Sequence, residues 1–79
     1  MEVKVLGPGC PKCEQLAANT QAALKELGLE VAVTKVKDFK DIAAHGVFVT
    51  PALVVDGEVK VAGQVPRPEE LKKFFAPQE

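Results

Sequence analysis

Two cysteines separated by two residues constrain this chain more than any other feature of its sequence. They are Cys10 and Cys13, the only cysteines present, and a Gly-Pro-Gly sequence precedes them. The β-branched run at residues 3–6 predicts a buried strand, and residues 14–27 carry apolar or small side chains at helical spacing. Pro11 suits the first helical position, where its missing N–H would have no partner. The pair is therefore predicted to lie in a strand-to-helix turn and the first turn of the helix.

The start of a helix is a favourable place for a thiolate. Unpaired backbone N–H groups and the positive end of the helix dipole point toward Cys10, and Lys12 adds a nearby cation. We therefore expect a lowered pKa for Cys10, whereas Cys13 should face the core from within the helix. A disulfide that closes so short a loop constrains the unfolded chain by only about 2 kcal/mol. Such a bridge is better suited to being made and broken than to holding a fold together.

Three other interpretations of the cysteine pair stay open at this point. The cysteines could be small buried hydrophobic residues or a permanent structural disulfide, although nothing else in the sequence indicates secretion. Two thiolates at this spacing also bind soft metals, as in the small copper or zinc carriers, whose element order, βαββαβ, ends in a strand. A complete zinc site would need two further ligands, and His45 is the only histidine. His45 is better explained by a favourable position at the end of a short helix.

Length and charge narrow the functions that the chain can have. Its 79 residues predict one domain, residues 1–79, and the net charge of -1 does not favour a partner such as nucleic acid or a membrane surface. Lys35, Lys37 and Lys40 cluster, but two aspartates interrupt them, which is typical of a solvated face. The first residues lack a signal-peptide pattern, and no apolar run approaches membrane-spanning length. We expect a cytoplasmic protein, where a CxxC pair indicates redox or metal chemistry.

The middle of the chain predicts a second strand and a second helix. Residues 29–36 read as a strand, which should pair in parallel with the first because a helix connects the two. Asp38 is expected to cap a short helix at residues 39–45 that turns Phe39, Ile42 and Ala43 inward.

The last third of the chain predicts a β-hairpin followed by a helix. Asp56-Gly57 separates two strand-like runs, residues 52–55 and 58–62, which is a strong hairpin signal. Val59 and Val61 alternate with charged residues, which predicts a strand with one solvated face at the edge of the sheet. A final helix should begin near Pro68, bury three apolar side chains and end at Pro77. Those three side chains are Leu71, Phe74 and Phe75. The resulting order, βαβαββα, predicts an α/β protein with a four-stranded mixed sheet and flanking helices.

With this element order and two short motifs, the chain resembles the thioredoxin and glutaredoxin superfamily, in particular its smallest single-domain members in archaea and bacteria. The motifs are Cys10-Pro11-Lys12-Cys13 after the first strand and Thr50-Pro51 before the hairpin. The resemblance covers essentially the whole chain and implies a thioredoxin-like fold. The chain departs from longer thioredoxins in lacking a tryptophan before the first cysteine. It departs from glutaredoxins in having Ala-Gly-Gln-Val at residues 62–65 instead of a double glycine with an aspartate, so the resemblance does not imply glutathione use.

The resemblance implies a substrate site beside the cysteines. In this family the proline that matches Pro51 is cis and packs next to the cysteine pair. The backbone before it, here Thr50, binds the extended chain of the substrate. A proline at that position presents no N–H and leaves the neighbouring backbone groups available to a visiting strand. Gly63 would allow a close backbone approach near the site.

The predicted activity is dithiol–disulfide exchange. The Cys10 thiolate would attack a protein disulfide, and Cys13 would resolve the mixed disulfide, while Pro11 and Lys12 tune local rigidity and redox potential. No cofactor or bound metal is expected beyond the redox-active Cys10–Cys13 disulfide itself. Expected partners are protein disulfides and a disulfide reductase as electron donor, with the protein acting as a monomeric electron carrier in cell redox homeostasis. Besides the metal carrier, the alternative is a non-catalytic redox sensor that uses the same cysteines.

Overall fold

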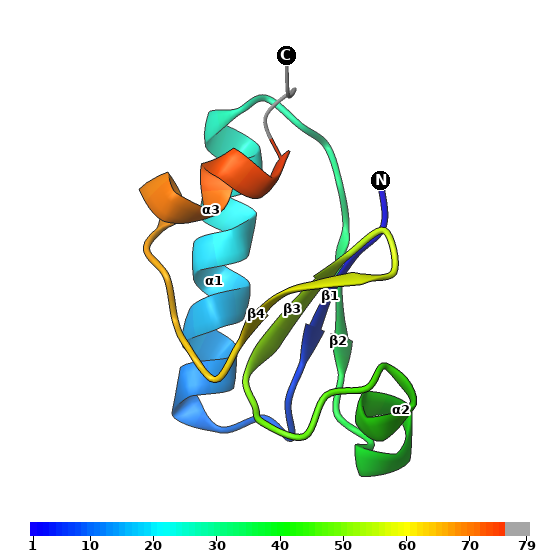
Figure 1. The fold of residues 1–79 in the computed structure, drawn as a ribbon. Coiled ribbons are helices and arrows are strands. Elements are labelled where there is room, and N and C mark those ends of the chain that lie inside the picture. The colour runs from blue at the N-terminus through cyan, green and yellow to red at the C-terminus, as the bar shows by residue number, and fades with distance from the viewer. Residues whose placement is uncertain (76–79) are drawn as a thin grey trace.

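The computed structural model of the protein describes residues 1–75, which form a four-stranded sheet and three helices (Figure 1). In chain order the elements are β1 (Val3–Leu6), α1 (Pro11–Glu26), β2 (Val33–Val36), α2 (Phe39–Ala44), β3 (Ala52–Val55), β4 (Glu58–Ala62) and α3 (Pro68–Phe75). The strands lie in the order β2-β1-β3-β4. β1 and β2 are parallel, and β3 is antiparallel to both of its neighbours. The predicted βαβαββα order and mixed sheet are confirmed.

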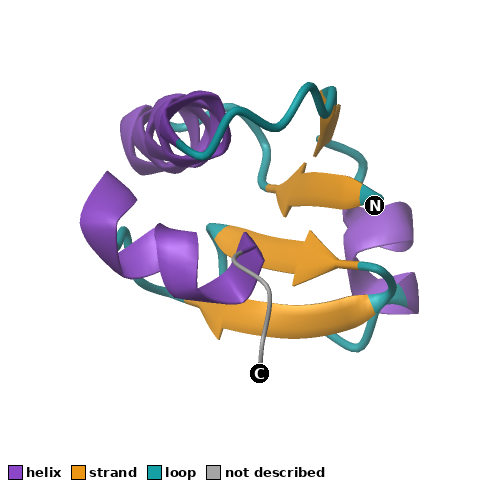
Figure 2. Cartoon of the chain, turned by 90° about the horizontal axis from the view of Figure 1, so that it is seen from above, coloured by secondary structure: helices purple, strands orange, loops and turns teal. Residues whose placement is uncertain are grey.

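The helices cover both faces of the sheet. α1 and α3 pack on one face and α2 on the other (Figure 2). Because side chains alternate along a strand, β1 directs Val3 and Val5 toward α1 and Leu6 toward α2. The larger core therefore lies beneath α1 and α3, and a smaller core lies beneath α2. The buried members of the smaller core are Leu6, Ile42, Val47, Ala52 and Val54.

α1 begins and faces the sheet as predicted. Cys10 is its N-cap residue and Pro11 opens its first turn. Its buried side chains recur every three or four residues, namely Cys13, Leu16, Ala17, Thr20, Ala23 and Leu24. The Thr20 hydroxyl donates a hydrogen bond to the carbonyl oxygen of Leu16 at 2.7 Å, so this buried polar group is satisfied. The apolar stripe holds the cysteine end of α1 against the sheet.

β2 is shorter than the predicted strand at residues 29–36, and covers only Val33–Val36. Val3, the first residue of β1, lies opposite Val33, so residues 29–32 have no partner in β1. On the other edge of β1, Glu2 bonds to the hairpin. Its N–H donates to the Asp56 carboxylate and its carbonyl oxygen accepts from the Asp56 N–H, both at 2.7 Å. Leu29 and Val31 are still partly buried against the larger core. Their alternation therefore reflects packing without strand pairing.

The prediction for the inward face of α2 was wrong at two of three positions. Ile42 is buried, but Ala43 is exposed and Phe39 is 68% exposed. α2 has only six residues, capped by Asp38, whose carboxylate accepts from the Lys40 N–H at 2.8 Å. A helix of under two turns directs few side chains to one side, and Val47 after the helix fills the remaining space in the small core.

The hairpin is confirmed, but the faces of β4 differ from the prediction. Asp56 and Gly57 form the turn, with φ of 52° and 81°, as a two-residue turn of this kind requires. β4 is an edge strand whose register slips against β3, so that Val59 lies opposite Val54 and Val61 opposite Leu53. Directly opposed residues share a face. The bulge therefore places Val61 in the larger core and leaves Val59, 40% exposed, on the α2 side.

α3 packs as predicted on its inner face. Leu71 and Phe75 are buried, and Phe74 is half-buried against the same core. Pro77, which the sequence predicts as the end of this helix, lies outside the described residues.

Candidate active site

The cysteine pair lies where the β1–α1 turn enters α1. Cys10 has extended backbone angles and caps the helix, and its Sγ accepts a hydrogen bond from the Cys13 N–H at 3.3 Å. The Cys10 carbonyl oxygen accepts from the Glu14 N–H at 3.0 Å, which is the first bond of the helical ladder. The Cys10 sulfur therefore sits at the positive end of α1 with a backbone donor directed at it.

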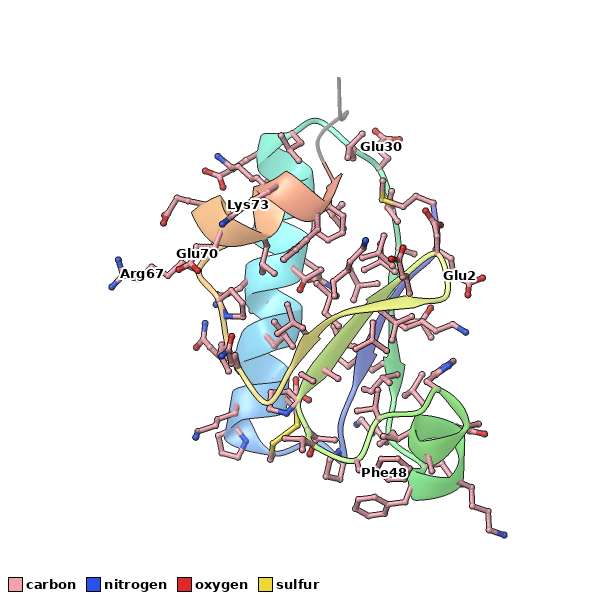
Figure 3. The ribbon with its side chains drawn as sticks, viewed as in Figure 1. Glu2, Glu30, Phe48, Arg67, Glu70 and Lys73 are labelled. Carbon is pink, nitrogen blue, oxygen red and sulfur yellow. A yellow bond between two sulfur atoms is a disulfide. The ribbon has the colours of Figure 1, made fainter. Side chains whose placement is uncertain are left out.

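The two cysteines form a disulfide and differ in exposure. Figure 3 shows this bond at the lower end of α1. Cys10 is half-buried at the surface, whereas Cys13 is 4% exposed and belongs to the core. An approaching molecule can therefore reach the sulfur of Cys10 more readily than that of Cys13.

Gly7 forms the wall behind Cys13, a role that sequence reasoning missed. A Cβ added to Gly7 would collide with the Cys13 sulfur and lie 3.0 Å from the Cys13 Cβ. The same point is 3.9 Å from the Thr50 Cβ, so Gly7, Cys13 and Thr50 meet in one place. The available signal was a glycine directly after a buried strand and before a cysteine motif.

Thr50, Pro51 and Gly63 lie together beside the cysteines. The Thr50–Pro51 peptide bond is cis, Pro51 is buried and Thr50 is half-buried. The Gly63 N–H donates to the Pro51 carbonyl oxygen at 2.7 Å. Gly63 has φ of +76°, and a Cβ there would lie 2.7 Å from Cγ1 of Val49. Both the backbone angle and the close approach thus require glycine at this position.

Charged side chains lie beside the turn on the side formed by α1 and β2. Lys12 and Glu14 are exposed in the first turn of α1. Glu14 pairs with Lys35 of β2, whose Nζ donates to the Glu14 carboxylate at 2.8 Å. That hydrogen bond, together with the positive charge of Lys35 and a smaller contribution from Lys37, lowers the pKa of Glu14. The solvated cluster predicted at Lys35 and Lys37 thus borders the cysteine turn.

An apolar patch borders the turn on the opposite side. Phe48 is 86% exposed, Val49 is 57% exposed and Phe39 is 68% exposed, and Figure 3 shows Phe48 projecting from the chain near α2. A hollow of about 280 Å³ lies between α2 and the segment leading to Pro51. Its lining consists of Phe39, Ile42, Ala43, Val47, Phe48 and Thr50. Large contiguous apolar patches are uncommon on the surface of monomeric proteins.

In residues 1–75, no group of three or more histidine, cysteine, aspartate or glutamate side chains is placed to hold a metal ion. No helix in this range has the length and apolar character needed to cross a membrane. His45 is the half-buried C-cap residue of α2, in agreement with its predicted place at a helix end.

Comparison with known proteins places this geometry in a family. The family model for the thioredoxin domain matches residues 1–76. The chain belongs to the thioredoxin family. It is 38% identical over 76 residues to a thioredoxin of Methanothermobacter thermautotrophicus, an alignment that covers 96% of this chain and 99% of that protein. It is 39% identical over 71 residues to a thioredoxin of Methanocaldococcus jannaschii, covering 90% of this chain and 81% of that protein.

Membership of the thioredoxin family confirms the resemblance drawn from the two motifs. The chain is a protein-disulfide oxidoreductase with a redox-active cysteine pair. The metal-carrier alternative required a βαββαβ order that ends in a strand. The chain has a βαβαββα order, and its last described element is the helix α3.

Proposed function

We propose that Cys10 is the attacking nucleophile and Cys13 the resolving thiol of this protein. The observation that carries the assignment is the difference between the two sulfurs. Cys10 is half-buried at the helix start with a backbone N–H directed at its sulfur, whereas Cys13 is 4% exposed behind it. A nucleophile needs both access and a stabilised thiolate, and a resolving thiol needs only to reach its neighbour.

The exchange proceeds in two displacements. The Cys10 thiolate attacks one sulfur of the substrate disulfide, forming a mixed disulfide and releasing the other substrate sulfur as a thiolate, which takes up a proton. Cys13 loses its proton and attacks the Cys10 sulfur, which forms the intramolecular disulfide and releases the second substrate thiolate, which is protonated in turn. Two electrons pass from the cysteine pair to the substrate. The 5.1 Å separation of the two Cα atoms allows the bond that ends the cycle.

The substrate chain is proposed to lie along Thr50 and Pro51. Thr50 meets Cys13 at Gly7, so a chain paired with the Thr50 backbone would bring its own disulfide to the cysteine turn. Gly63 supports this segment from behind through its hydrogen bond to the Pro51 carbonyl oxygen. The apolar hollow beside Thr50 offers room for a large apolar side chain of the same substrate. These features favour proteins over small disulfides as substrates.

The direction of electron flow and the partners complete the proposal. A disulfide reductase would return two electrons to the Cys10–Cys13 bond after each cycle. The protein would work as a monomer in the cytoplasm, where thiols are kept reduced. Pro11 and Lys12 would adjust the rigidity of the turn and the potential of the pair.

A redox titration tests the assignment of the cysteines. The purified protein is equilibrated across dithiol/disulfide buffers, free thiols are trapped with an alkylating mass tag, and the oxidised fraction is recorded. We expect a reversible two-electron transition that both Cys10→Ser and Cys13→Ser abolish. Cys13→Ser should still capture a protein substrate as a stable mixed disulfide, whereas Cys10→Ser should not. Capture by Cys10→Ser and not by Cys13→Ser would reverse the roles.

A turnover assay separates the carrier from a redox sensor. With excess dithiol as reductant, a carrier reduces many equivalents of a protein disulfide such as insulin per molecule. A sensor becomes oxidised once and stops, so a single equivalent of product would refute the proposed catalytic cycle.

A further inference from the structure

Three charged side chains lie near one another at the end of the sheet where α1 begins. Glu14 belongs to α1 and Lys35 to β2, and Lys37 is the residue directly after β2. Lys35 Nζ lies 2.8 Å from the Glu14 carboxylate. The side-chain end of Lys37 lies over Gly9, since a Cβ on Gly9 would be 4.0 Å from both its Cε and its Nζ. Gly9 is bonded directly to Cys10, so the Lys37 charge lies beside the nucleophile.

The sheet holds these two lysines in place. Lys35 lies opposite Val5 in the parallel pair, and Val5 faces the α1 core, so Lys35 also lies on the α1 side. The residue between the lysines, Val36, packs against the small core under α2. Its carbonyl oxygen accepts a hydrogen bond from the Gly7 N–H at 2.8 Å. The end of β2 is thus fastened directly to the cysteine turn.

The ionisable groups around Cys10 can be enumerated from the elements that pack there. α1 supplies Lys12 and Glu14, and β2 supplies Lys35. Lys37 and Asp38 follow β2, and the Asp38 carboxylate accepts a hydrogen bond from the Lys40 N–H at the start of α2. The segments at residues 7–9, 47–51 and 62–65 carry no ionisable side chain. Lys35 forms an ion pair with Glu14 and so neutralises the carboxylate that lies one residue after Cys13. Lys37 contributes a positive charge beside Gly9.

We propose that Lys37 and Lys35 are positioning residues for the charge of Cys10, beyond the cysteine motif itself. Lys37 favours the Cys10 thiolate directly through its ammonium over Gly9. Lys35 acts through Glu14, by neutralising the carboxylate that opposes the thiolate. The inference rests on the proposed function, because it takes Cys10 as the nucleophile. It adds that the end of β2, and not only the start of α1, sets the reactivity of that nucleophile.

The size of the effect follows from the exposure of the groups. A unit charge about 6–8 Å from a thiolate, acting through water, changes its pKa by about half a unit. At a pH below the pKa, removal of the Lys37 charge should therefore lower the thiolate fraction about threefold. The effect should shrink in about 1 M salt, where the Debye length is about 3 Å.

The test compares alkylation of Cys10 in the reduced full-length protein across pH. Iodoacetamide is the probe, and peptide mass spectrometry assigns the modified cysteine. The variants are Lys37→Gln, Lys37→Arg and the control Lys25→Gln. Lys25 also carries one exposed positive charge, but lies in the last turn of α1, about 22 Å along the helix from Cys10. The control thus reproduces the change in net charge at a distance of about two Debye lengths.

Lys37→Gln should react with iodoacetamide about threefold more slowly below the pKa, with its pH profile moved upward, and Lys37→Arg and Lys25→Gln should match the wild type. A profile for Lys37→Gln that coincides with that of Lys25→Gln would overturn the role of Lys37. If the wild type is alkylated first at Cys13, the proposed function itself fails. An unchanged profile with reaction still at Cys10 leaves the proposed function standing and removes only this inference.

The role of Lys35 has its own test in a double-mutant cycle. Lys35→Gln should slow alkylation of Cys10 in the wild-type background and have a smaller effect in the Glu14→Gln background, because the carboxylate it neutralises is then absent. Equal effects in both backgrounds would show that Lys35 does not act through Glu14.

Discussion

Gly63→Ala should damage the protein more than a matched glycine replacement elsewhere. Gly63 and Gly46 have nearly the same backbone angle, φ of +76° and +77°, so alanine incurs the same backbone penalty at both, about 1–2 kcal/mol. The surroundings differ. Nothing lies within 4 Å of a Cβ at position 46, whereas a Cβ at position 63 would be 2.7 Å from Cγ1 of Val49. The pair therefore isolates one steric contact.

The free-energy cost of that contact depends on how the Val49 side chain moves away from the added methyl group. A β-branched side chain has few rotamers, and forcing it away from its preferred one costs about 0.5–1.5 kcal/mol. The extra loss of unfolding free energy in Gly63→Ala is therefore about 1 kcal/mol. In a domain of this size that corresponds to a Tm about 4–8 °C below that of Gly46→Ala. Because Val49 adjoins Thr50, we also expect Gly63→Ala to slow reduction of protein disulfides, and Gly46→Ala to leave the rate unchanged.

Thermal unfolding followed by far-UV circular dichroism measures the stability difference, since the chain has no tryptophan or tyrosine to report by fluorescence. Both variants are studied in the oxidised form. Val49→Ala removes the colliding atom, and Val49 is already 57% exposed, so this replacement alone should change stability little. Combined with Gly63→Ala it should restore the Tm to that of Gly46→Ala. Equal Tm values for the two glycine variants, or no recovery in the double variant, would refute the reasoning.

Three further predictions concern the same end of the molecule. Gly7→Ala should lower the unfolding free energy by about 1–3 kcal/mol in a denaturant titration, because the new methyl group displaces the Cys13 sulfur. For the same reason Cys13 should become more reactive to alkylation in the reduced protein, and protection of Cys13 as in the wild type would contradict this. Pro51→Ala should slow the reduction of a protein disulfide by about tenfold, equivalent to about 1.4 kcal/mol, while changing the reduction of a small disulfide far less; equal slowing of both would argue against a substrate site there. The lowered pKa of Glu14 means that its ion pair with Lys35 stabilises the fold above the ordinary carboxyl pKa of 4.5 and that this small contribution is lost as the pH falls through the lowered value. In Lys35→Gln, a carboxyl NMR titration should find the Glu14 pKa moved upward, and an unchanged value would exclude Lys35 as the cause.

Much of the fold and the centre of the site could be predicted because their signals are local. Pro11 after Cys10, an apolar stripe at helical spacing and a glycine at the hairpin turn each act within a few residues. They set where α1 begins and where β3 turns into β4, and the structure has both elements as predicted. The cysteine pair is local in the same sense, because two residues separate its members at the start of a helix. For Pro51, only the resemblance to a family supplied the expectation that its peptide bond is cis.

The remaining features depend on segments that are distant in sequence and meet only in the folded chain. Phe39 has an apolar side chain that the sequence predicts to be buried, yet Ile42 and Val47 already fill the space beneath α2. Val59 and Val61 obey the alternation of a strand until a bulge against β3 separates them onto two faces. The pairing of Glu14 with Lys35 spans 21 positions and exists because parallel strands bring the end of β2 beside the start of α1. Local conformational preferences determine where the helices and strands form. The limited space between these elements determines which side chains are buried, which are exposed and which charged groups lie near Cys10.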